Sequence, residues 1–167
     1  MSLKTNIRFL ILDSCIYNAS GPRCTSLKEL IKIDKSESCI VLSKSSTLKV
    51  RDGNPEPRYY DHELGSINSM GLPNLGYEFY IKSAQAINKP YIISVNGLTL
   101  EDTKEIVRNI IKDKLVNGIE INLSCPNIIG KGQLAYDLPK MEKYLDDIFT
   151  IIRKVKRPAF LVGLKLF

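Results

Sequence analysis

Stretches of two kinds alternate along the chain. Five have the largely apolar composition of strands buried in a parallel sheet, at residues 9–20, 38–44, 91–97, 118–124 and 159–166. Four others have helical character, at residues 26–33, 75–88, 100–114 and 141–155. The last two of these carry their apolar residues three or four positions apart, which is typical of amphipathic helices. Strands that alternate with helices predict parallel pairing through right-handed crossovers.

Two of the helices carry start signals. Ser26 is followed by Glu29, and Thr99 by Asp102. This spacing is that of a capping box, in which each side chain satisfies a free backbone N–H group at the helix start. The long stretch from Ser45 to Asn74, rich in Pro, Gly and Asn, is predicted to be a loop without regular structure.

Polar or reactive side chains follow every predicted strand. They are Asn18 and Ser20, Lys44 and Ser45, Asn96, Asn122 and Cys125, and Lys165. The C-terminal ends of parallel strands open on one side, which is the active face of a (β/α)8 TIM barrel. A doubly wound sheet gathers its site at a switch point instead, and no GxGxxG motif follows any strand. The pattern therefore favours an α/β barrel.

The length bears on how much of a barrel is present. A (β/α)8 barrel typically needs ~250 residues, whereas this sequence has 167. We therefore expect residues 1–167 to form a single domain that is the N-terminal portion of a barrel and supplies about its first five strands.

Composition and charge exclude several classes of protein. Apolar residues make up 44% and charged residues 25%, as in globular proteins. The apolar runs are too short to span a bilayer and no signal peptide is visible, which predicts a cytoplasmic protein without a membrane partner. The net charge of +6 comes from scattered lysines, and without Trp or a basic–aromatic stretch it indicates no nucleic-acid groove.

The four cysteines, at 15, 24, 39 and 125, contain no CxxC pair, so no metal site is expected. Cys15 and Cys39 lie in strand-like stretches and are expected to be buried. Cys125 differs because it stands in the polar segment "INLSCPN" at a strand end. It fits either a buried thiol at a polar strand end or a general base, with Asn122 and Asn127 holding a planar ligand by their amides.

Other strand ends and the long loop add features of an anion site. Lys44 and Lys165 occupy matching positions after two strands, although each alone also fits a lysine whose stem is buried and whose amine reaches water. In the loop, Asn68 supplies an amide, and backbone N–H groups near Met70, Gly71 and Leu72 are placed to bind a carboxylate. Long loops of this kind are usually functional.

Five segments together closely resemble dihydroorotate dehydrogenases. They are "NASG" (18–21), "SKSST" (43–47), "RDGNPEPRYYDHELGSINSMGLPN" (51–74), "NLSCPN" (122–127) and "GQLAYD" (132–137). The resemblance runs over nearly the whole chain and is to the soluble, fumarate-using class 1A. The membrane-bound class has serine as its base, and Cys125 argues against it.

The resemblance implies a flavoprotein of pyrimidine biosynthesis that oxidises dihydroorotate to orotate with FMN and passes the electrons to fumarate, giving succinate. Cys125 is then the catalytic base, assisted by Lys44, and loop 126–137, with Gly130 and Gly132, is a lid. The matching flavin-binding positions are Ala19, Ser20, Gly21, Lys44, Ser45, Asn122 and Lys165. The matching substrate-binding positions are Lys44, Asn68, Met70, Gly71, Leu72, Asn122 and Asn127. A homodimer of the full-length protein is also implied.

Two alternatives remain at this level. One is a truncated, non-catalytic half-barrel that needs a partner chain. The other is a cysteine hydrolase in which His62, the single histidine, activates Cys125. One residue departs from the family pattern: Asn96, in "SVNG", stands where a small residue is expected.

Overall fold

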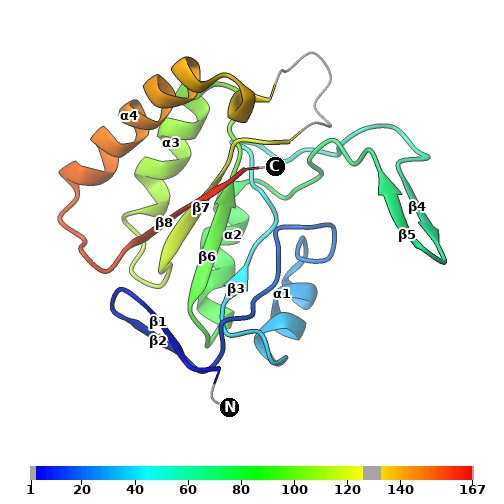
Figure 1. The fold of residues 1–167 in the computed structure, drawn as a ribbon, viewed down its shortest axis with the longest axis horizontal. Helices are drawn as coiled ribbons and strands as arrows, with labels where there is room; N and C mark the ends of the chain where they lie inside the picture. Colours follow the sequence, from blue (N-terminus) through cyan, green and yellow to red (C-terminus); the bar gives the residue numbers. More distant parts are fainter. Residues whose placement is uncertain (1–2, 126–132, 167) are drawn as a thin grey trace.

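Four parallel strands form the central sheet of the computed structural model, which describes residues 3–125 and 133–166 (Figure 1). They are β3 (Val41–Leu42), β6 (Tyr91–Val95), β7 (Gly118–Asn122) and β8 (Leu161–Lys165), in the order β3-β6-β7-β8. The strands lie in the sheet in the same order in which they follow one another in the sequence, and each neighbouring pair is parallel. This is the strand order of part of a (β/α)8 barrel.

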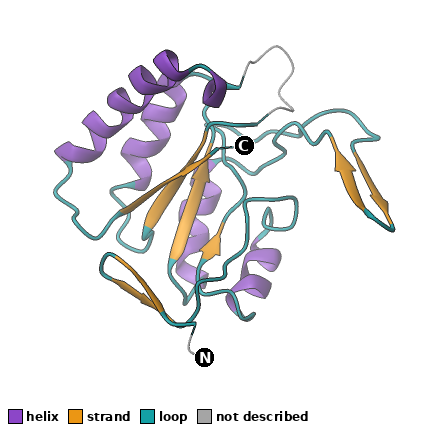
Figure 2. Cartoon of the chain, viewed as in Figure 1, coloured by secondary structure: helices purple, strands orange, loops and turns teal. Residues whose placement is uncertain are grey.

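The helices pack against one face of this sheet, as Figure 2 shows. They are α1 (Leu27–Asp34), α2 (Tyr77–Ser83), α3 (Leu100–Ile110) and α4 (Leu138–Lys154), with short 3-10 turns at Ala84–Ala86 and Leu134–Tyr136. The core between sheet and helices contains Ile93 and Ile119 from the strands and Ile106 and Ile148 from the helices, all almost fully buried. Alternation along β7 sends Glu120 to the opposite face from Ile119.

Both predicted capping boxes are present. The Ser26 side chain accepts from Glu29 N and the Glu29 carboxylate accepts from Ser26 N, at the start of α1. Thr99 and Asp102 make the same reciprocal pair at the start of α3. These starts depend on residues three apart in sequence, so local sequence was sufficient to place them.

The prediction of one strand over residues 9–20 is wrong. Residues Thr5–Ile7 (β1) and Leu10–Leu12 (β2) form an antiparallel hairpin instead, which turns at Arg8 with a positive φ of 54°. Residues after it lie beside β3 without a regular ladder: the Asn18 side chain accepts from Leu42 N (2.9 Å) and donates to Leu42 O (2.7 Å). An amide side chain therefore takes the place of backbone pairing, and the sheet has four parallel strands rather than five.

The prediction that the loop between Ser45 and Asn74 has no regular structure is wrong. It contains a second hairpin, formed by β4 (Tyr59–His62) and β5 (Gly65–Asn68), which projects from the body of the molecule (Figure 1).

Cys39 is buried as expected, but Cys15 is exposed, because the segment that carries it is not a sheet strand.

Candidate functional site

The C-terminal ends of the strands surround a cavity of about 200 Å³. Residues far apart in sequence meet there, since parallel strands end on the same side of the sheet. The residues that line it are Ser20, Gly21, Pro22, Lys44, Ser45, Asn68, Met70, Gly71, Leu72, Asn122, Ser124, Cys125 and Lys165. The structure thus brings together most of the residues that the sequence singled out.

Lys44 follows β3 and is only 6% exposed. Burial lowers the pKa of Lys44, and the neighbouring positive charge of Lys165 lowers it further, while the thiols of Cys24 and Cys125 act in the opposite direction. Among the described residues no carboxylate forms an ion pair with Lys44. A buried ammonium without a paired carboxylate is stabilised when an anion binds beside it.

Asn122 ends β7 with its side-chain amide held at both ends. Its Nδ2 donates to Ser45 Oγ (3.0 Å), and its Oδ1 accepts from Ser124 N (3.1 Å). Ser45 Oγ also lies 3.1 Å from Ser20 Oγ, and Lys165 Nζ lies 3.4 Å from the same Ser20 hydroxyl. The wall formed by β3, β7 and β8 is therefore a connected set of polar side chains rather than separate groups.

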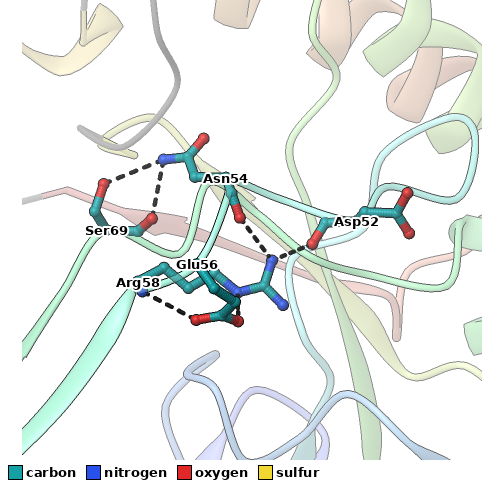
Figure 3. Close-up of polar contacts among 5 residues, drawn as sticks. All are labelled: Asp52, Asn54, Glu56, Arg58 and Ser69. Atoms are coloured by element: carbon teal, nitrogen blue, oxygen red, sulfur yellow. Dashed lines mark hydrogen bonds and ion pairs between the residues drawn. The ribbon is translucent and has the colours of Figure 1, made fainter.

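The loop that contributes Asn68 and Met70 to Leu72 to the cavity is held by hydrogen bonds at the base of the hairpin β4–β5. Asn54 Nδ2 donates to Ser69 O (2.9 Å) and Ser69 Oγ (3.1 Å), and Arg58 Nη1 donates to Asp52 O and Asn54 O (Figure 3). Glu56 pairs with Arg58, its Oε1 lying 2.8 Å from Arg58 Nε. These contacts hold the backbone that leads into residues 70–72.

Gly71 is required at this point of the loop. Its φ is +69°, and a Cβ there would lie 2.2 Å from Asn54 Oδ1. Its carbonyl accepts from Arg51 Nε (2.7 Å), and Leu72 follows with a φ of 58°. Two consecutive residues in the left-handed region make a sharp bend, which turns the backbone of residues 70–72 into the cavity wall.

Cys125 is half-buried and lines two cavities. The second has a volume of about 220 Å³ and lies between the start of α3 and Tyr144 of α4. The sequence predicted that Asn96 lies with the other polar residues at the strand ends. It lines this second cavity and not the first.

The remaining predicted residues have varied outcomes. Ala19 does not line the cavity, but its carbonyl accepts from Gly21 N (2.8 Å) and so shapes the turn beneath it. Asn127, Gly130, Gly132 and most of the expected lid lie outside the described residues. His62 is exposed on the projecting hairpin, where its Nδ1 accepts from Leu64 N (3.3 Å), so the pairing with Cys125 that a hydrolase needs gains no support.

Sequence reasoning missed two residues of this region, Ser94 and Glu120. Ser94 and Glu120 are opposite each other in the register of β6 and β7, and Ser94 Oγ donates to Glu120 Oε1 (2.9 Å). The signal that was available is the two-residue period of β7, which puts Glu120 on the same face as Asn122.

Comparison with known proteins assigns the family. Residues 2–165 match the family model described as dihydroorotate dehydrogenase. The chain belongs to the dihydroorotate dehydrogenase family. This assignment agrees with the resemblance seen in the sequence.

Curated relatives in this family carry the name dihydroorotate dehydrogenase A (fumarate). The one from Streptococcus pyogenes serotype M18 is 40% identical over 168 residues, which is 96% of this chain and 54% of the relative. The one from Streptococcus uberis is 42% identical over the same shares of the two chains. The chain thus spans about half the length of these relatives.

A solved structure shows the same fold at lower identity. It is the dihydroorotate dehydrogenase of Eimeria tenella, crystallised with ferulenol, with a TM-score of 0.72 and 18% sequence identity. The match covers 91% of this chain and 44% of the other. It supports the assignment of the four-stranded parallel sheet to part of a (β/α)8 barrel.

None of the helices in the described residues has the length and apolar character required to cross a bilayer. Within the same residues, no group of three or more His, Cys, Asp or Glu side chains is placed to hold a metal ion.

Proposed function

We propose that this chain is the N-terminal portion, as a single domain, of an enzyme that oxidises dihydroorotate to orotate in pyrimidine biosynthesis, with FMN as cofactor and fumarate as electron acceptor. The observation that carries the proposal is the joint lining of one cavity by Cys125, Lys44 and the amides Asn68 and Asn122, in a member of this family. The names of the streptococcal relatives support fumarate as the acceptor. The resemblance further supports a cytoplasmic enzyme that is a homodimer at full length.

The residues at the cavity fit FMN chemically. A flavin ring has carbonyl oxygens and ring nitrogens along one edge, and Lys44, Lys165 and Asn122 offer N–H donors to such acceptors. Ser20 and Gly21 form a turn at the cavity edge, where a Cβ on Gly21 would meet only Ala19 O, at 3.9 Å. The described residues enclose about 200 Å³, less than the ~300–1,000 Å³ usual for small-molecule sites, so they form one part of the wall such a cofactor needs.

Oxidation of dihydroorotate removes one proton and one hydride from neighbouring ring carbons. FMN, when bound, supplies the chemistry that accepts the hydride and later returns it to fumarate. The Sγ of Cys125, as thiolate, takes the proton, so the electron pair of the broken C–H bond forms the new ring double bond as the hydride leaves. Cysteine is one of the side chains that act as general bases in enzymes.

The negative charge of the proposed substrates explains why a buried lysine, Lys44, lines the cavity. Dihydroorotate, orotate, fumarate and succinate all carry carboxylates, and the buried Lys44 ammonium gains a partner when any of them binds. Asn68 and Met70 to Leu72 line the same cavity as Lys44 and supply neutral donors and acceptors. A single site that binds both the pyrimidine and the dicarboxylate makes the two substrates compete.

The experiment is anaerobic stopped-flow absorbance of the FMN-loaded, full-length protein. Dihydroorotate is expected to bleach the flavin, and fumarate is expected to restore it. Cys125→Ala should slow the bleaching by ~10² to 10⁴, the usual contribution of a general base, while FMN stays bound. Cys15→Ala, which removes the exposed cysteine, is the matched control and should leave the rate unchanged.

Two results would count against the proposal. Bleaching of Cys125→Ala at the wild-type rate would remove Cys125 as the base. Reoxidation by NAD and not by fumarate would leave the family assignment intact and show that the class of acceptor is wrong.

A further inference from the structure

A row of buried hydroxyl groups, which begins at residues of the cavity wall, joins two opposite charges. Lys165 Nζ lies 3.4 Å from Ser20 Oγ, Ser20 Oγ 3.1 Å from Ser45 Oγ, and Ser45 Oγ 2.9 Å from Ser94 Oγ. The row ends where Ser94 Oγ donates to Glu120 Oε1 (2.9 Å). The three hydroxyls come from different segments of the chain and are at most 5% exposed.

The chemistry of the two ends determines the direction of every bond in between. A carboxylate only accepts hydrogen bonds, an ammonium only donates them, and a serine hydroxyl has one proton to donate. Ser94 gives its proton to Glu120, so Ser45 must be the donor to Ser94. Ser45 then has none left for Ser20, so Ser20 is the donor to Ser45 and accepts from Lys165.

This direction extends to the amide of Asn122. Ser45 Oγ has used its proton on Ser94, so toward Asn122 it is only an acceptor. It therefore accepts from Asn122 Nδ2 (3.0 Å), while Asn122 Oδ1 accepts from Ser124 N (3.1 Å). The carboxylate two residues before Asn122 thus makes Ser45, through two hydroxyls, an acceptor toward the amide. This agrees with the Ser124 N–H, which requires Oδ1 at the other end.

We propose that Glu120 is a positioning residue that fixes the hydrogen-bonding face of the ligand cavity by acting through Ser94 and Ser45 on Asn122. The inference rests on the proposed function, and it deepens it by naming what sets the donor pattern of the site. With Glu120 in place, the second N–H of the Asn122 amide and the N–H groups of Lys44 and Lys165 serve as donors at the cavity. The wall can then bind the carbonyl oxygens of a pyrimidine. Without the carboxylate, the Ser94 and Ser45 protons are free to reverse. Ser45 can then direct its proton at Asn122 Nδ2, and the hydrogen bond that holds this end of the amide is lost.

The test is a double-mutant cycle on the FMN-loaded, full-length protein, with the dissociation constant of orotate measured by titration of the flavin absorbance. Glu120→Gln keeps the side-chain shape but can donate as well as accept. It is expected to weaken orotate binding about two- to tenfold, the value of one neutral hydrogen bond. Ser94→Ala, which cuts the row in the middle, is expected to weaken it to a similar degree.

The decisive comparison is Glu120→Gln in the Ser94→Ala background. Because Glu120 acts through Ser94, the second substitution should add no further loss, whereas independent effects would multiply. Glu142→Gln removes one carboxylate from the exposed face of α4 and should leave binding unchanged, which controls for net charge. Thermal melting of every variant shows whether each is folded.

Each outcome decides something. Equal orotate affinity in wild type and Glu120→Gln, or full multiplication of the two losses, overturns the inference and leaves the proposed function standing. If the wild-type protein shows no flavin change with orotate, the proposed function itself fails and the inference fails with it. If Glu120→Gln unfolds, Ser45→Ala replaces it in the cycle with Ser94→Ala, and multiplication of those two losses again overturns the inference.

Discussion

Arg157, in the turn between α4 and β8, provides the most direct test of how the site is supported. Its Nη1 donates to Ile111 O (3.2 Å) and Asp113 O (2.6 Å), and its Nη2 donates to Lys114 O (3.2 Å) and Val116 O (2.6 Å). One guanidinium thus satisfies carbonyls from the end of α3 to the start of β7. It fixes the connection that brings β7 beside β8, and with it the ends that carry Asn122 and Lys165.

Replacing this side chain by methionine keeps most of its apolar stem and removes all four hydrogen bonds. A net value of about 0.5–1.5 kcal/mol each gives roughly 2–6 kcal/mol. The bond to Lys114 O is exposed and contributes least, but loss of the Arg157 guanidinium contact with the Phe160 ring, 4.9 Å from Cζ to centroid, adds about 0.5–1 kcal/mol. We expect Arg157→Met to lower the free energy of unfolding by roughly 3–5 kcal/mol, a large share of the ~5–15 kcal/mol of a typical domain.

Arg157→Lys separates charge from geometry. An ammonium keeps the charge but cannot span four carbonyls, so about a third of the loss should be recovered. The matched control is Arg153→Met, because Arg153 is exposed and its guanidinium lies 5.8 Å from the Phe149 ring. That substitution should cost under about 1 kcal/mol.

The measurement is urea unfolding of the full-length protein, followed by circular dichroism, with the m-values compared to confirm that only stability changes. Hydrogen exchange should show the greatest loss of protection in residues 111–117 for Arg157→Met. The reasoning is refuted if Arg157→Met is no less stable than Arg153→Met, or if Arg157→Lys is as stable as wild type.

Three further substitutions test other contacts. Burial acts to raise the pKa of Asp34, but its hydrogen bonds with Asn88 and Lys89 outweigh this and hold that pKa below its usual value. The stability that ionised Asp34 contributes is therefore present above about pH 4 and lost as the pH falls through the folded-state pKa. Asp34→Asn should flatten the acid side of the stability–pH curve measured by urea unfolding, and an unchanged curve contradicts this. Since burial lowers the pKa of Lys44, orotate binding in alkaline buffer should take up protons, which calorimetry in buffers of different ionisation enthalpy measures. Lys44→Met should abolish this proton uptake and weaken orotate binding about 10- to 100-fold. Proton uptake that persists in Lys44→Met would exclude Lys44 as its source. Gly71→Ala, with its Cβ 2.2 Å from Asn54 Oδ1, should raise the orotate dissociation constant at least about tenfold with α/β content unchanged, and wild-type affinity would show that the bend is not needed.

Local patterns were enough for the helices and for the four strands of the central sheet. The capping pairs at Ser26 and Thr99 operate over three residues. The apolar runs that became β3, β6, β7 and β8 are buried in a sheet covered by those helices. The gathering of Lys44, Asn122, Cys125 and Lys165 also followed from sequence, because strands joined by helical crossovers must run parallel and end on one side.

Other features depend on partners distant in the chain. The apolar residues at the start of the predicted strand 9–20 fit a sheet strand equally well. Only the pairing of Leu10–Leu12 with Thr5–Ile7, around Arg8, made a hairpin of this segment, and Cys15 is left exposed. Asn18 reads as a polar strand end, yet its amide binds the backbone of Leu42, 24 residues away. The link from Glu120 to Asn122 runs through hydroxyls on two other segments. Hydrogen bonds of this kind have no sequence period, so tertiary packing alone decided them.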